Sequence, residues 1–254
     1  MLYVEIASVG LGIGVLFGVF GAGGSAFATP VLVLLGVSGS VAVASPLPAM
    51  LPAAIVGAHR YLRSGRLDTR VATLAVAGGM PGTVLGALAS VAVGGSRLVL
   101  ASGVMLLGVG VRVLLPDPGG GADRRAARRD SSGLVLGAGF AIGLLTGLLA
   151  NGGGFLLVPT FIMLFGMTSG EAAGTSMVAV GALAVPTLAT HWALGHIDWP
   201  VALAFAIGVL PGSLAGARVS QLLPARSARR AFGALLVGFA LWFLAGQALG
   251  AWVR

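Results

Sequence analysis

Two glycine-rich segments contain the residue types that bind small anions. One extends from Gly21 to Pro30 and the other from Ala150 to Pro159, and a short apolar run follows each break. Clustered glycines break a helix, because each costs about 1 kcal/mol relative to alanine. The free N–H groups at the start of the next helix bind anions. The residues that we predict to line such a site are Gly23, Gly24, Ser25, Asn151, Gly152, Gly153 and Gly154.

Three hydroxyl side chains extend this predicted site. Ser45 and the pair Thr175-Ser176 lie at equivalent positions, early in an expected helix of each half of the chain. Their hydroxyls either donate to an oxyanion or bond back to carbonyls of their own helix. The sequence leaves both uses open.

No residue pattern indicates catalysis or a bound metal. The chain has no cysteine, and its three histidines and seven acidic residues are scattered without the spacing of a metal site. We therefore expect no catalytic residue, no metal and no other cofactor. Glu171 stands where a cap at the start of a helix is expected.

The elements that must position these residues are membrane-spanning helices. Of the 254 residues, 57% are hydrophobic and only 9% are charged, whereas a soluble domain carries about 25% charged residues. The apolar runs are continuous, unlike the alternating segments of a barrel. The composition predicts an all-α, polytopic membrane protein in a lipid bilayer. Its net charge of +8 then reflects membrane topology and not a nucleic-acid partner.

Ten apolar runs divide into five plus five around one polar stretch. We predict a first repeat over residues 1–116, a linker over 117–132 that is a solvated loop, and a second repeat over 133–254. The run Pro30–Val37 has about half the length of a span. Whether it and Phe155–Met167 cross fully or are re-entrant stays open. The run from Val41 to Leu62 is expected to form one helix, kinked near Ser45 by nearby prolines.

The two halves repeat each other. A Pro-Gly-x-x-x-Gly-Ala string begins at Pro81 and again at Pro211, and the offset of 130 residues also matches Asp68 with Asp198. Close helix packing is the favoured role of the glycines in these strings, as in other small-xxx-small motifs. It is also the alternative to an anion site for the two glycine-rich segments.

The arginines predict an inverted relation between the repeats. All 15 basic residues are arginines, and the turn at 60–70 holds four while its equivalent at 190–200 holds none. Because arginine-rich turns stay cytoplasmic, equivalent turns face opposite sides. We predict a cytoplasmic linker, external termini and a place in the plasma membrane. Broken helices at equivalent places in two inverted halves are typical of transporters that work by alternating access.

The segment from Gly143 to Pro159, with its three consecutive glycines, resembles the sulfite exporter family TauE/SafE. The first half departs from the pattern, with Ser25 in place of the third glycine. The resemblance covers nearly the whole chain and implies a permease for a small sulfur-containing anion such as sulfite or a sulfonate. A passive anion channel, a permease for another small anion such as sulfate, and a membrane-embedded enzyme are the alternatives. The chain could form a homo-oligomer.

Overall fold

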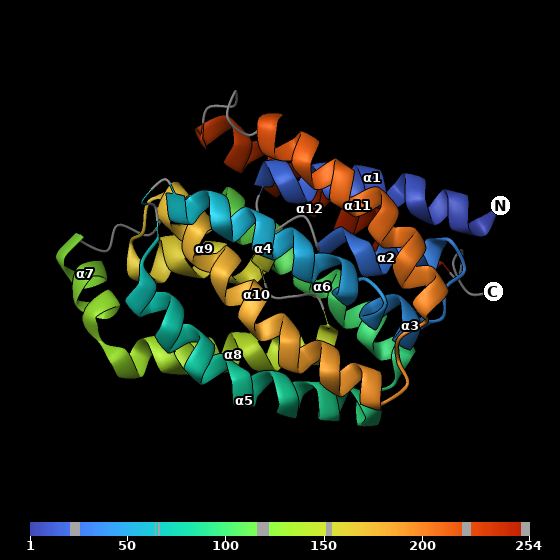
Figure 1. Cartoon of the computed structure of the whole chain (residues 1–254), viewed down its shortest axis with the longest axis horizontal. Helices are drawn as coiled ribbons and strands as arrows, with labels where there is room; N and C mark the ends of the chain where they lie inside the picture. Colours follow the sequence, from blue (N-terminus) through green and yellow to red (C-terminus); the bar gives the residue numbers. More distant parts are fainter. Residues whose placement is uncertain are drawn as a thin grey trace.

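The computed structural model describes residues 1–20, 26–63, 65, 67–115, 122–150, 154–219 and 225–249, which form helices and short connections without a strand (Figure 1). The helices are α1 (Leu2–Phe20), α2 (Ala28–Leu34), α3 (Gly39–Ala44), α4 (Leu47–Arg63), α5 (Thr69–Val93), α6 (Gly95–Leu114), α7 (Ala122–Asp130), α8 (Ser132–Leu149), α9 (Gly154–Phe165), α10 (Ser169–Ala193), α11 (Trp199–Val219) and α12 (Ala225–Ala248).

Seven of these helices are long and apolar enough to cross a membrane: α1, α5, α6, α8, α10, α11 and α12. Their outward faces are apolar as well. Ile207 and Leu203 of α11 are 70% and 62% exposed, which suits contact with lipid and not with water. The predicted class of a polytopic α-helical membrane protein is confirmed.

Glycine stripes hold α1 against α11. A Cβ on Gly208 or Gly212 would collide with the backbone carbonyl of Ala7 or Leu11, and one on Gly14 with that of Val209. Residue numbers rise together along the two helices, so they run parallel. The absence of side chains lets the two backbones approach, as in other small-residue contacts between membrane helices.

The pair α5 and α8 is built in the same way. Gly78, Gly82 and Gly86 of α5 lie against the carbonyls of Leu136, Phe140 and Leu144 of α8, and these helices are also parallel. The predicted packing role of the glycines in the two Pro-Gly strings is therefore confirmed. Each half of the chain supplies one helix to each of these pairs.

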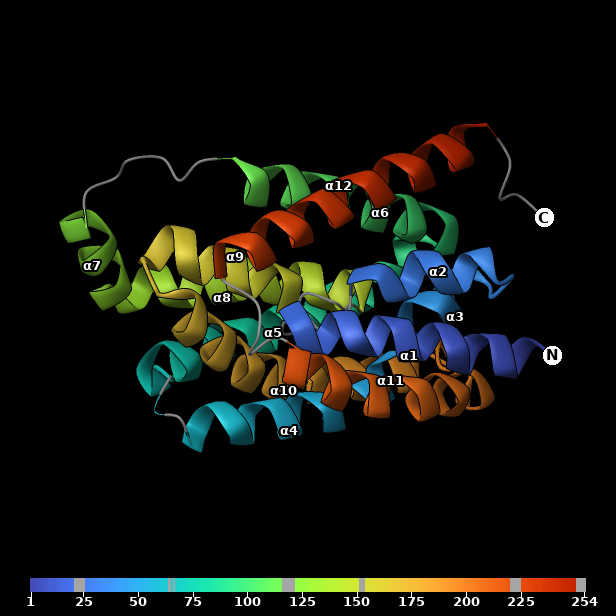
Figure 2. The ribbon, with the colours of Figure 1, turned by 90° about the horizontal axis from the view of Figure 1, so that it is seen from above.

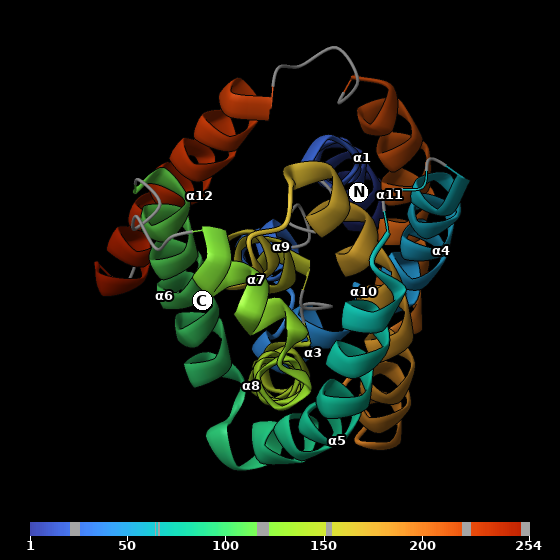
Figure 3. The ribbon, with the colours of Figure 1, turned by 90° about the vertical axis from the view of Figure 1, so that its left-hand side faces the viewer.

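The remaining long helices pair between the halves too. α6 packs on α12 and α4 on α10, and Figure 2 shows α6 with α12 at one edge of the molecule and α4 at the opposite edge. α9 lies near the centre, enclosed by longer helices (Figure 3). In Figure 1, α1 begins at the label N on the right and α8 begins beside α7 on the left, so these equivalent helices run in opposite directions.

Two predictions about local structure need correction. The linker contains the helix α7 and is not simply a loop, because alanine and arginine are strong helix formers. The run from Val41 to Leu62 does not form one kinked helix. α3 ends at Ala44 and α4 begins at Leu47, with a turn at Pro46, which has no N–H to continue the hydrogen-bond ladder.

The two short apolar runs give helices too short to span a bilayer alone. α2 has 7 residues and α9 has 12, which correspond to lengths of about 10 and 18 Å. The hydrocarbon core is about 30 Å thick. Neither helix can therefore cross the hydrocarbon core by itself.

Candidate functional site

The helix breaks that the sequence predicts are present at both glycine-rich segments. α1 ends at Phe20 and α2 begins at Ala28, whereas α8 ends at Leu149 and α9 begins at Gly154. Ala150 takes a left-handed conformation with φ of 48° at the end of α8. Gly154 is buried. The other predicted loop residues lie outside the described residues: Gly23, Gly24, Ser25, Asn151, Gly152 and Gly153.

The residues that flank both breaks are buried in protein. Ala26 and Phe27 before α2 are 0% and 3% exposed, and Phe155 at the start of α9 is 1% exposed. All three belong to one buried apolar cluster, which also contains Leu106 of α6. Irregular backbone at membrane depth is tolerated only inside protein or along a wet cavity. The helix starts are thus in the interior, where a substrate site belongs.

Thr146 is a candidate site residue that the sequence interpretation missed. Its side chain is 1% exposed, and its hydroxyl has no hydrogen-bond partner in the described part of the chain. It lies on the buried face of α8, one turn before Ala150. Leaving a buried hydroxyl unpaired costs about 1–3 kcal/mol. A ligand that accepts a hydrogen bond from this hydroxyl would recover that energy. The sequence signal that could have identified Thr146 is a hydroxyl residue within an apolar helix, four residues before the break.

Several other buried hydroxyls donate to carbonyls of their own helices. Thr83 donates to the carbonyl of Met80, Ser102 to Leu98 and Thr187 to Leu183. Ser176, a predicted site residue, donates to the carbonyl of Ala173 at 2.9 Å. Of the two uses left open for the Ser176 hydroxyl, bonding back to the helix is the one observed.

Ser45 and Thr175 form equivalent hydrogen bonds between the halves. The Ser45 hydroxyl accepts from the N–H of Asp198 at 3.1 Å, and the Thr175 hydroxyl accepts from the N–H of Asp68, also at 3.1 Å. Both hydroxyls are fully buried. Each one therefore satisfies a backbone donor just before the start of a long helix, α11 or α5.

The structure does not bring Ser45 and Thr175 together. α5 begins at the left of Figure 1 and α11 at the right, so the two hydroxyls lie toward opposite ends of the molecule. One site cannot contain both. The residues near the helix breaks, Gly154 and Thr146, form the better defined candidate.

An ion cluster ties the linker to both halves. Arg129 of α7 contacts Asp68 at 2.6 Å and Glu171 at 3.5 Å. Burial alone raises the pKa of Asp68, but the Val71 N–H and the Arg129 guanidinium outweigh it and hold that pKa below its usual value. Glu171 also forms a capping box with Thr168, which confirms its predicted role as a cap.

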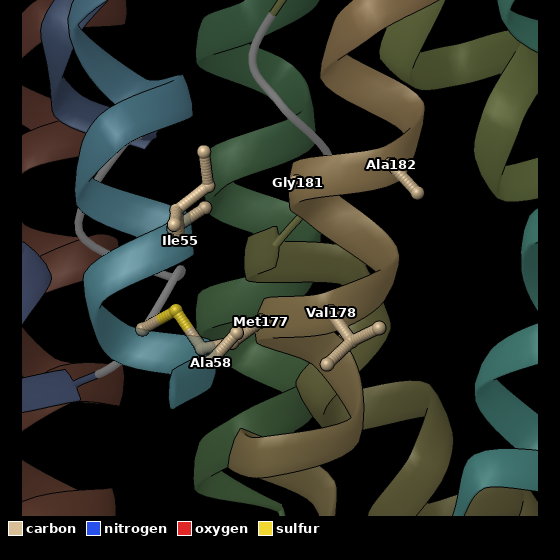
Figure 4. A pocket seen from close by; sticks show the side chains of 7 residues that line it. Ile55, Ala58, Met177, Val178, Gly181 and Ala182 are labelled. Atoms are coloured by element: carbon tan, nitrogen blue, oxygen red, sulfur yellow. The ribbon is translucent and has the colours of Figure 1, made fainter. Parts of the chain in front are cut away.

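An apolar cavity of about 350 Å³ lies between α4 and α10. Ile55 and Ala58 of α4 face Met177 and Gly181 of α10 across it (Figure 4). Its lining residues, which also include Ala54, Val178 and Ala182, carry no polar side chain. The cavity has no group that would hold an anion, and it lies between helices at equivalent places in the two repeats.

Comparison with known proteins identifies the family. The family model described as sulfite exporter TauE/SafE matches residues 6–252. A probable membrane transporter protein of Xylella fastidiosa strain Temecula1 is 28% identical over 251 residues, which cover 96% of this chain and 95% of that protein. The probable membrane transporter protein YunE of Bacillus subtilis is 23% identical over 255 residues, covering 89% and 92%. No solved structure matches. The chain therefore belongs to the sulfite exporter TauE/SafE family and is a membrane transporter.

Proposed function

We propose that this transporter moves a small sulfur oxyanion, sulfite or an organosulfonate, by alternating access. The family description supplies the substrate class. The observation that carries the proposal is the pair of broken helices whose flanking residues are buried in one cluster. Discontinuous helices in both halves are the usual place of a transporter's substrate site.

The anion site that we propose uses neutral donors. Among the described side chains, the buried polar ones are hydroxyls and one histidine, with no arginine or acid. Backbone N–H groups at the start of α9, the Asn151 amide and the Ser25 and Thr146 hydroxyls would then hold the oxyanion. Glycines allow the backbone to approach the anion, because a Cβ would stand between them.

In alternating access by an inverted repeat, the two halves exchange conformations, so that the site opens first to one side of the membrane and then to the other. The two parallel helix pairs, the equivalent hydrogen bonds of Ser45 and Thr175 and the opposite directions of α1 and α8 all support an inverted relation. A channel for the same anions is the alternative function, and transport assays distinguish it from a carrier.

Uptake into proteoliposomes tests the function. We expect saturable uptake of radiolabelled sulfite or a short sulfonate. We also expect faster uptake when the vesicles contain the unlabelled anion, because a carrier exchanges anions more readily than it returns empty. Equal rates with and without internal anion would favour a channel. Uptake of sulfate alone would correct the substrate class, and uptake of none of these anions would contradict the proposal.

Cysteine labelling tests the inversion. The chain has no native cysteine, so Thr69→Cys at the start of α5 and Ala193→Cys at the end of α10 report alone, and both positions are exposed. We expect an impermeant thiol reagent to label Thr69→Cys only from the cytoplasm and Ala193→Cys only from outside. Labelling of both positions from the same side would show that the repeats are parallel.

Removal of the unpaired hydroxyl tests the site. Thr146→Val keeps the shape of the side chain, and we expect the KM of the transported anion to rise about tenfold, the equivalent of one hydrogen bond of about 1.4 kcal/mol. The variant should be at least as stable as the parent, because a buried unpaired group is lost. Thr187→Val is the matched control, since that hydroxyl already bonds to Leu183. An unchanged KM for Thr146→Val would remove Thr146 from the site.

A further inference from the structure

Two histidines contact each other at one end of α10. His191 lies in the last turn of α10 and is fully buried, whereas His196 lies in the following turn and is partly exposed. The two Nδ1 atoms are 3.1 Å apart, and Nε2 of His191 is 2.8 Å from the carbonyl oxygen of Gly147 in α8. We name His191 and His196 the histidine pair.

The hydrogen bonds fix how many protons the pair can hold. The Gly147 carbonyl only accepts, so His191 Nε2 carries a hydrogen and donates it. Two nitrogens at 3.1 Å need one hydrogen between them, so only one Nδ1 is protonated. In the neutral pair His196 Nδ1–H donates to the lone pair of His191 Nδ1. Nε2 of His196 is then the one ring nitrogen with a free lone pair.

One more proton fits without breaking either bond. It adds to Nε2 of His196, and the hydrogen between the two Nδ1 atoms can then shift to His191. The positive charge moves from the partly exposed ring to the buried ring without rotation of either. A second extra proton would place two N–H groups face to face and break the contact.

We propose that the histidine pair is a proton-binding site that couples proton uptake to binding of the anion in the adjacent helix break. This rests on the proposed function. His191 bonds to the carbonyl of Gly147, the residue that directly follows Thr146, whose buried unpaired hydroxyl belongs to the proposed anion site. A positive charge on His191 next to this part of α8 favours the anion, and by linkage the anion favours the proton to the same extent.

Few other charges face the pair. α8 and α9 carry no titratable residue, and those of α4 belong to its C-terminal half. Arg70 of α5 and Glu171 of α10 lie near the starts of their helices, which the bond from Asp68 to Thr175 joins, whereas His191 lies in the last turn of α10. Asp198 follows His196 by two residues, and Arg97 lies in the first turn of α6. The Asp198 carboxylate accepts from the N–H of Val201, and no carboxylate in the described part of the chain forms an ion pair with either imidazole.

The electrostatics place protonation on the acidic side of neutrality. Burial lowers the pKa of His196 below its ordinary value. The pair is therefore neutral at high pH and takes up its proton as the pH falls. With the topology that we propose, the pair faces outside, so an acidic exterior loads it.

Histidine NMR tests proton binding without any transport. In the purified protein we expect the nitrogen shifts of His191 and His196 to titrate together with the uptake of one proton. Saturating methanesulfonate should move this titration upward by about one pH unit, which corresponds to tenfold tighter anion binding by the protonated form. Independent titration of the two rings, or no titration between pH 5 and 8, would overturn the inference.

Proteoliposomes with an internal pH indicator test coupling. Methanesulfonate is suitable because it carries no proton of its own near neutral pH. For one proton per anion, a gradient of one pH unit should accumulate it up to about tenfold, with matching internal acidification. His191→Gln keeps an N–H for Gly147, and His196→Asn keeps one for His191, but neither new side chain takes a proton. Both variants should retain anion exchange and lose acidification and accumulation, while His59→Gln should keep all three.

The outcomes separate the two proposals. Acidification that persists in His191→Gln and His196→Asn, or parent flux without proton movement, overturns the coupling while the proposed function stands. If the parent neither transports the anions tested nor shifts its histidine titration with methanesulfonate, the proposed function fails and the coupling fails with it. The NMR titration without anion would in that case still show whether the histidine pair takes up one proton.

Discussion

Asn151→Asp should abolish anion transport while the protein remains folded. The substitution changes little in size but places a negative charge where the oxyanion would bind. A like-charge contact costs several kcal/mol, and about 3 kcal/mol lowers affinity by about 100-fold. The measurement is initial uptake of radiolabelled sulfite or sulfonate, normalised to the amount of protein in the vesicles.

Two further variants make this result specific. Asn151→Gln keeps a neutral amide and should retain a measurable part of the flux. Gly153→Val should block transport by filling the space that the anion needs next to the backbone. Helix packing as the role of this segment predicts the reverse pattern, with little effect of Asn151→Asp and loss of stability for Gly153→Val. Normal flux through well-expressed Asn151→Asp would refute the site.

Gly208→Ala should sharply destabilise the protein by separating α1 from α11. The added methyl group would collide with the carbonyl of Ala7 and the backbone near Leu11, so the helices must move apart and lose contacts along their whole length. Overpacking of this kind costs about 1–3 kcal/mol, and backbone has less room to give than side chains. We expect a lower melting temperature in detergent and reduced yield.

Gly12→Ala is the matched control on α1. Nothing lies within 4 Å of a Cβ at Gly12, and alanine forms helix better than glycine by about 1 kcal/mol. Its melting temperature should equal or exceed that of the parent. Equal melting temperatures for Gly208→Ala and the parent would show that the close contact of α1 and α11 contributes nothing to stability.

The sequence predicted those features of the fold that depend on local composition. Continuous apolar runs predicted the long helices, and the glycine spacing after Pro81 and Pro211 predicted close packing between helices. Glu171 was correctly identified as a cap. α7 was missed because its charged sequence resembled a solvated loop. Its residue Arg129 contacts carboxylates far away in the chain, and one sequence cannot show such contacts.

The candidate site could be predicted in part. The helix breaks follow from clustered glycine, which is a local property. Thr146 was missed because its unpaired hydroxyl is evident only when every neighbour is known. Ser45 and Thr175 looked like one site because their positions match at the offset of 130 residues, but they bond at the starts of α11 and α5, which lie at opposite ends of the molecule. Symmetry in sequence therefore does not imply proximity in space.

The pairing of α1 with α11 has a consequence for biosynthesis. Among the described helices α1 is made before all others, whereas α11, which covers its glycine stripe, is followed by α12 alone. At about 5–20 residues per second, on the order of ten seconds or longer pass between the synthesis of α1 and that of α11, and the stripe is without its partner helix during this time. The interval is shorter for α5, because its partner α8 is the second long apolar helix after it in the chain. The close contact between α1 and α11 can therefore form only after α11 has been made.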